Sequence, residues 1–168
     1  PILLELSMIN KENIRQVVSD ELEGTGTVIV DIHISNSNNI KVVLDSFEGV
    51  NIDECVKINR LIEGNFDRDV EDYQLEISSY GISQTFIIPL HYLKNMNRLV
   101  EIHQKQGKII KGTLKSVELS EDKKDINWIE ISNNKKIKEE GKKKKTEVEE
   151  IIRVQKGEIQ KARLVPVF

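Results

Sequence analysis

The stretch LEISSYGI, residues 75–82, separates two halves of the chain that have different sequence patterns. Its first half alternates apolar and polar residues, which is typical of a β-strand, and it then runs into serine and glycine. A nucleophile elbow at Ser79 would need glycine two positions earlier, where Ile77 stands. A phosphate loop would need a longer glycine spacing followed by Lys-Ser or Lys-Thr. Neither motif is present, so Ser78, Ser79 and Gly81 are expected to form a turn that ends a strand.

Upstream of this turn, residues 10–44 predict a helix followed by a β-hairpin. Apolar residues recur at helical spacing between the capping residue Asn10 and Gly24. The period then changes to two, and the turn sequence NSNN at 36–39 joins two alternating runs. The side chains expected to share one face of the first strand are Val28, Val30, Ile32 and Ile34.

A second helix is expected over 51–66, followed by a strand over 73–79. Asn51 and Glu54 have the spacing of a capping box at the helix start. The side chains expected on its packing face are Ile52, Cys55, Val56, Ile62 and Phe66. The order helix, strand, strand, helix, strand predicts a domain over 8–85 with two helices on one face of a small, mostly antiparallel sheet.

Downstream of the turn, the pattern changes to short alternating runs. Residues 86–97, which contain Pro89, are expected to be a connector. The runs in 98–168 are not interrupted by a long helical pattern, and Gly112 lies where a strand could bend sharply. They predict a small all-β barrel of five strands. The fold class is therefore α+β with two domains.

Charge is divided unequally between the two halves. Residues 1–90 hold six basic and sixteen acidic side chains, a net charge of −10, whereas residues 91–168 hold nineteen basic and twelve acidic side chains, a net charge of +7. This asymmetry indicates two surfaces that meet two kinds of partner, one basic and one anionic. The alternative is surface charge without a function.

Two basic segments in the second half are candidate contacts with an anionic partner. Residues 135–145 hold seven lysines and two glutamates, and Lys142, Lys143, Lys144 and Lys145 are expected at the tip of a loop between two strands. Such a loop is either a solvated hairpin or a salt-sensitive contact to phosphates. The last strand, which carries Lys161 and Arg163, either closes the barrel or lies at its edge and pairs with a partner.

Several other classes of protein are disfavoured. No apolar run is long enough to span a bilayer and no signal peptide is recognisable, so the expected location is the cytoplasm. Residues 1–7 precede Met8 and are expected to be an addition to the natural chain. A lone cysteine, Cys55, and three scattered histidines argue against a disulfide, a metal site or a cofactor, and we expect none.

Three segments of the sequence resemble the bacterial ribosome maturation factor RimP family. NIDECVKINRLI at 51–62 is similar to the start of that family's second helix. LEISSYGIS at 75–83 is similar to its Leu-Glu-Val-Ser-Ser-Pro-Gly signature at the domain junction, and EIQKARLVPVF at 158–168 is similar to its carboxy-terminal motif. The resemblance implies that Ser78, Ser79 and Gly81 mark the junction between the domains.

The resemblance also implies a fold and a role. The first domain would be similar to KH-like units and the second to Sm/SH3-like barrels. The implied role is to bind the free small (30S) ribosomal subunit as a monomer, near the decoding region, ribosomal protein twelve and the adjacent rRNA. The family has proline where this chain has Tyr80, and Asp-Arg-Pro where it has Ser83, Gln84 and Thr85, so any contact made by that arginine is lost.

Two other functions are weighed against this role. A hydrolase would need Ser78, Ser79 or Cys55 beside one of the histidines, and no glycine pattern builds an oxyanion hole, so we expect no enzyme and no catalytic residue. An Sm-like RNA chaperone would stack single-stranded RNA on exposed aromatic rings. In the second half, Trp128 is expected on the core face, which argues against that function.

Overall fold

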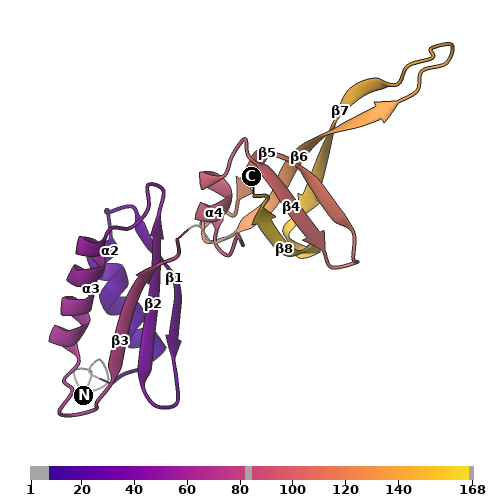
Figure 1. The fold of residues 1–168 in the computed structure, drawn as a ribbon. Helices are drawn as coiled ribbons and strands as arrows, with labels where there is room; N and C mark the ends of the chain where they lie inside the picture. The colour runs from indigo at the N-terminus through magenta and orange to yellow at the C-terminus, as the bar shows by residue number, and fades with distance from the viewer. Residues whose placement is uncertain (1–7, 82–84, 167–168) are drawn as a thin grey trace. The chain divides into compact units, whose positions relative to one another are not determined.

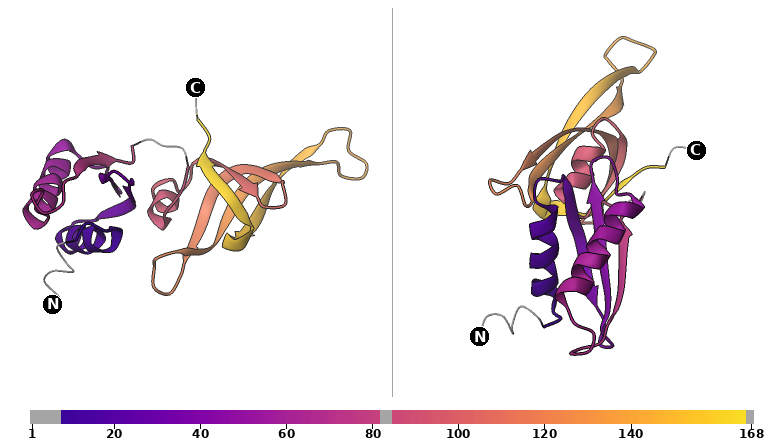
Figure 2. Two further views of the ribbon diagram at one scale, coloured as in Figure 1. Left: turned by 90° about the horizontal axis from the view of Figure 1, so that it is seen from below. Right: turned by 90° about the vertical axis from the view of Figure 1, so that its left-hand side faces the viewer.

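The computed structural model describes residues 8–81 and 85–166, and the chain divides into two compact units, Pro1–Ser83 and Gln84–Phe168 (Figure 1). The first unit holds α2 (Lys11–Leu22), β1 (Thr27–Ile34), β2 (Asn39–Ser46), α3 (Ile52–Asn65) and β3 (Gln74–Ser79). Both helices cover the same face of a three-stranded sheet (Figure 2). The described part of the chain has no helix with the length and apolar character that a bilayer span requires.

The sheet of the first unit is mixed rather than mostly antiparallel. Its order is β1-β2-β3, with β1 antiparallel and β3 parallel to β2. The parallel pairing follows from α3, because a helical crossover returns the chain to the end of the sheet where β2 began. This connection makes β3 an outer strand.

A β-bulge changes the predicted face of β1. The register between β1 and β2 shifts between Ile29 and Asp31. Ile32 is buried as predicted, but Val28, on the other side of the bulge, is 40% exposed and Thr27 is buried instead. An extra residue in a strand reverses the alternation beyond it, which the sequence pattern did not reveal.

The core of the first unit lies between the helices and the sheet, and it corrects the predicted face of α3. Ile62 and Phe66 are buried as predicted, but Ile58 is also buried, whereas Ile52 is 80% exposed and Val56 40% exposed. Cys55 is half-buried. Ile52 and Val56 therefore leave apolar surface exposed at the start of α3.

The second unit is a five-stranded antiparallel sheet with one short helix. It holds α4 (Pro89–Lys94), β4 (Leu99–Gln104), β5 (Ile109–Leu119), β6 (Ile126–Ile137), β7 (Thr146–Gln155), the 3₁₀ turn η1 (Lys156–Glu158) and β8 (Ile159–Leu164). The strand order is β7-β6-β5-β4-β8. In the described residues no ladder joins β7 to β8, so the predicted closed barrel is not observed. Two register shifts between β5 and β6 bend the sheet around its core.

The segment predicted as a connector holds α4 and contributes to this core. Phe86 and Tyr92 are buried, and their rings meet edge to face with centroids 5.0 Å apart. Burial, followed by the charge of Asp125, raises the pKa of Tyr92 to about 12. Tyr92 therefore stays neutral at physiological pH as a packing residue.

Gly112 lies at a close crossing of β5 and β6. A Cβ atom there would lie 2.5 Å from the carbonyl oxygen of Ser132 and would also clash with the side chain of Ile131. The close approach of the two strands at this position therefore depends on the missing side chain, whereas the register shifts of β5 lie further along, between Leu114 and Ser116 and between Glu118 and Leu119.

Candidate functional sites

The predicted lysine loop is the end of a long hairpin arm formed by β6 and β7. The arm extends beyond the other strands of its sheet (Figure 1). Lys135 pairs with Val148 and Ile137 with Thr146, so β6 continues three residues into the predicted loop 135–145, and the loop itself covers 138–145. Pairing with residues of β7 holds residues 135–137 in strand conformation, although two of them are lysines.

The tip of the arm is basic and its second strand is acidic. Lys142 pairs with Glu139 at 2.7 Å, whereas Lys143, Lys144 and Lys145 are exposed. On β7, Glu149 accepts a hydrogen bond from the Ser132 hydroxyl at 2.6 Å. The positive charge is therefore concentrated in the loop rather than spread along the arm.

The other two predicted contact residues lie on β8, at the opposite edge of the sheet from β7. Lys161 is exposed, but the Arg163 guanidinium is half-buried and donates to Glu101 Oε1 at 3.1 and 3.3 Å. The structure does not join these residues and the loop lysines into one patch. The charge of Arg163 is already compensated, so Lys161 is the better candidate for an external contact.

Glu101 is the centre of a charged cluster that the sequence pattern did not predict. Its side chain is only 8% exposed and bonds His103 Nε2 at 2.5 Å, while Lys111 Nζ lies 3.6 Å away. The hydrogen bond from His103, with help from Arg163, lowers the pKa of Glu101. Alternation in RLVEIH places Glu101 and His103 on one face, but the partners Lys111 and Arg163 become visible only with the strand register.

Trp128 was predicted on the core face, but it does not lie in the core. It is half-buried on the outer face of β6, and the Arg153 guanidinium carbon sits 3.8 Å from its ring centroid. Arg153 also pairs with Glu130 at 3.5 Å. A ring already covered by a cation is not an open stacking platform, so this arrangement argues against an Sm-like RNA chaperone.

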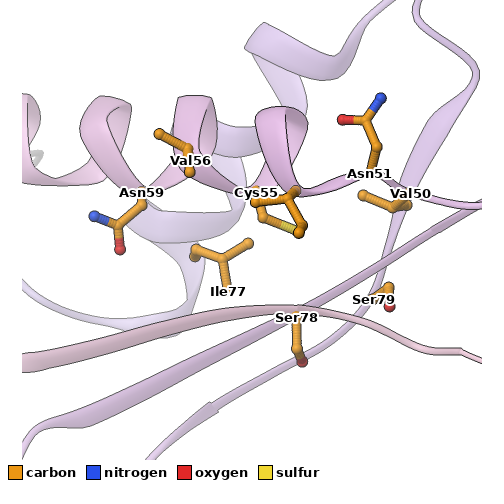
Figure 3. Close-up of a pocket in the computed structure, with 9 residues that line it drawn as sticks. Val50, Asn51, Cys55, Val56, Asn59, Ile77, Ser78 and Ser79 are labelled. Atoms are coloured by element: carbon orange, nitrogen blue, oxygen red, sulfur yellow. The ribbon is translucent and has the colours of Figure 1, made fainter.

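Ser78 and Ser79 line an open groove between α3 and the end of β3 (Figure 3). Val50, Cys55 and Ile77 face one another across it, and the Ser78 hydroxyl points away from the helix. No histidine lies among the lining residues that the structure describes. Burial, followed by the charge of Glu54, raises the pKa of the Cys55 thiol. The groove therefore lacks the activated nucleophile that a hydrolase requires.

The predicted domain junction follows this groove directly. Gly81 has a φ of +69°, a left-handed conformation that favours glycine. Residues 82–84 lie outside the described residues, so the role of Ser78, Ser79 and Gly81 as a junction motif stays a prediction.

Within residues 8–81 and 85–166, no group of three or more His, Cys, Asp or Glu side chains has the arrangement needed for a metal ion.

Residues 17–83 match the family model described as the RimP N-terminal domain. Residues 17–83 therefore form a domain of the RimP N-terminal family. The predicted resemblance is thereby confirmed. The match covers α3, β3 and the groove between them, and most of the other elements of the first unit.

The curated relatives to which this chain is similar share one name, ribosome maturation factor RimP. The protein of Porphyromonas gingivalis strain W83 is 42% identical over 94 residues, which are 56% of this chain and 59% of the relative. The protein of Christiangramia forsetii is 33% identical over 99 residues, 58% of this chain and 65% of the relative. The protein of Flavobacterium psychrophilum is 33% identical over 96 residues, which are 56% of this chain and 62% of the relative. The chain thus spans less than two thirds of these relatives.

Proposed function

We propose that this chain is a ribosome maturation factor that binds the free small ribosomal subunit near the decoding region and acts without catalysis. The observation that carries the proposal is the match of residues 17–83 to the RimP N-terminal domain, together with relatives whose printed name is ribosome maturation factor. The lack of a nucleophile beside an imidazole in the described groove supports a binding role.

The charge division supports a different partner for each unit. With a net charge of −10 over residues 1–90, the first unit repels phosphates and attracts a basic protein, for which ribosomal protein twelve is the proposed candidate. A KH-like mode of RNA binding is not supported, because a Gly-x-x-Gly loop is absent from residues 8–90.

The second unit is the proposed contact with ribosomal RNA. Lys143, Lys144 and Lys145 at the arm tip and Lys161 on β8 are exposed cations that suit phosphate contacts. The bent sheet around one core supports kinship with Sm/SH3-like folds, although the described strands do not close. The proposed factor acts as a monomer in the cytoplasm.

Co-sedimentation tests the proposal. The purified chain is mixed with free small subunits, large subunits or joined ribosomes and centrifuged through sucrose, and the bound fraction is measured by immunoblot. We expect selective migration with the small subunit. Equal migration with both subunits, or with neither, would reject the proposed role.

A further inference from the structure

We propose that the groove between α3 and β3 binds an extended basic segment of a partner protein, which pairs with the free edge of β3 as an added strand. This inference specifies how the acidic unit of the proposed function meets a basic protein, and it rests on that function for the partner's role.

Of the four outer strands, β3 is the one whose edge the described residues leave open. The β1 edge carries a bulge between Ile29 and Asp31. The β7 edge is dense in charge, and β8 is covered in part by Thr85, which bridges to Arg163, and by the Phe86 amide, which donates to the Ala162 carbonyl at 2.8 Å. Bulges, charges and covering segments are the usual protections of an edge strand. The ladder of β3 shows no register shift.

The hydrogen bonds of β3 show which backbone groups are directed outward. The Gln74 amide donates to the Asn38 carbonyl and the Tyr80 amide to the Leu44 carbonyl, at 3.0 and 2.8 Å. In a strand, backbone groups of successive residues point to opposite sides, so the even-numbered residues of β3 face β2. The amides and carbonyls of Leu75, Ile77 and Ser79 therefore point away from the sheet, where an incoming strand could bond them.

The groove beside this edge suits an apolar side chain of such a strand. It has a volume of about 410 Å³. Ile77 rises from β3 towards Cys55 and Val56 on α3 (Figure 3). Ile52 and Val56, also in the lining, are 80% and 40% exposed, so they add exposed apolar surface beside the groove. An added strand would send every second side chain towards these residues.

The charge around the groove selects a basic partner rather than a nucleic acid. Glu48 precedes the groove-lining residues in the chain, and Asp53 lies in sequence between the lining residues Ile52 and Cys55; both acidic residues are exposed. Lys57, one helical turn further on, is paired with Glu21 at 3.0 Å. With the unit's net charge of −10, lysine or arginine side chains that alternate with apolar ones would meet an attractive potential, and phosphates a repulsive one.

The probe is an end-capped octapeptide that alternates lysine and valine. Binding to the full chain is measured by fluorescence anisotropy, and access to the groove by the rate at which maleimide modifies Cys55, the chain's single cysteine. We expect the peptide to slow modification at least about tenfold at saturation. The same peptide with N-methyl groups on alternate amides, or with glutamate in place of lysine, is expected to bind at least about tenfold more weakly.

Two matched variants locate the site. Val56 and Val70 are both exposed valines of the first unit, 40% and 79%, but only Val56 lines the groove. Val56→Glu is expected to weaken peptide binding at least about tenfold, whereas Val70→Glu, with the same added charge, leaves it unchanged or slightly tighter. Ser79→Pro removes an outward amide and is expected to weaken binding similarly, while circular dichroism confirms that the variant is folded.

Each other outcome overturns the inference. Equal binding by Val56→Glu and Val70→Glu would place the peptide elsewhere on the acidic unit, and failure of the peptide to bind would remove the site. Protection of Cys55 by a uridine octanucleotide instead of the peptide would assign the groove to RNA. None of these results affects co-sedimentation of the wild type with the small subunit, so the groove and the proposed function fail separately.

Discussion

At the residue scale, the two positions that matter most for the second unit are Gly112 and Glu101. Gly112 allows β5 and β6 to approach within a distance that no Cβ atom permits. Glu101 pairs with Lys111 and Arg163 on the neighbouring strands and bonds His103 on its own strand, while its own side chain is 8% exposed. Residues on neighbouring strands therefore constrain both positions: β6 leaves no room for a side chain at 112, and the cations of β5 and β8 favour a carboxylate at 101.

Gly112→Ala is expected to destabilise the protein. The added methyl group meets the Ser132 backbone carbonyl, which cannot move without disturbing the ladder, and such overpacking costs about 1–3 kcal/mol. Urea denaturation followed by tryptophan fluorescence measures the loss, because Trp128 lies in the same unit. Gly157→Ala is the control, since nothing lies within 4 Å of the position that its added methyl group would take. Equal midpoints for the two variants would contradict the prediction.

Removal of the Glu101 charge is expected to give a stability loss that depends on pH. The pKa of Glu101 is lowered in the folded state, so its contribution is fully present above the pKa of an unfolded glutamate and is lost as pH falls through the folded value. Glu101→Gln should therefore lower Tm at neutral pH, and the difference from wild type should shrink below about pH 4. Glu121→Gln, at an exposed position, is the control. A difference that stays constant from pH 7 to pH 3 would exclude this linkage.

At the element scale, helix α3 sets up the groove because its start is capped. The Asn51 side chain accepts from the Glu54 amide at 2.9 Å, and the Glu54 carboxylate accepts from the Asn51 amide at 3.1 Å. Glu54 also accepts a hydrogen bond from the Thr27 hydroxyl, which ties the helix start to β1. The capping box thus fixes the turn of α3 that carries Ile52 and Cys55.

Asn51→Ala is expected to destabilise the first unit by about 0.5–2 kcal/mol, because the amides at the helix start lose the side-chain cap. Asn59→Ala in the same helix is the matched control and should be neutral or stabilising by about 0.5 kcal/mol, since alanine has the higher helix propensity. Thermal unfolding monitored by circular dichroism at 222 nm gives both values. The reverse order of stability would show that the cap is unimportant.

At the scale of the whole molecule, a net charge of −3 conceals two halves of opposite sign. An acidic unit with an open strand edge and a basic unit with a lysine-tipped arm are suited to different partners. Two weak contacts joined by one chain bind more tightly than either does separately, provided that both sites can be reached together. This division is the physical basis of the proposed assembly role.

Neutralising the loop lysines is expected to weaken binding to the small subunit and to flatten its salt dependence. Each lost phosphate contact lowers the number of counterions that are released on binding. The slope of log affinity against log salt therefore becomes shallower. The variant changes Lys142, Lys143, Lys144 and Lys145 to glutamine; the matched control makes the same change at Lys105, Lys108, Lys115 and Lys124, which are also exposed. Binding is measured from 50 to 300 mM KCl. Equal slopes for the two quadruple variants would show that charge alone, rather than the arm, determines affinity.

The sequence by itself determined the two helices of the first unit, most strand positions, the capping box at Asn51 and the resemblance to RimP, because caps, periods and motifs are local properties of the chain. The tertiary structure alone decided which edges stay open and which charges meet. The cluster around Glu101 depends on strand register, the exposure of Val28 on a bulge, and the parallel pairing of β3 on the crossover through α3. These arise from packing between residues that are far apart in sequence, which no local pattern encodes.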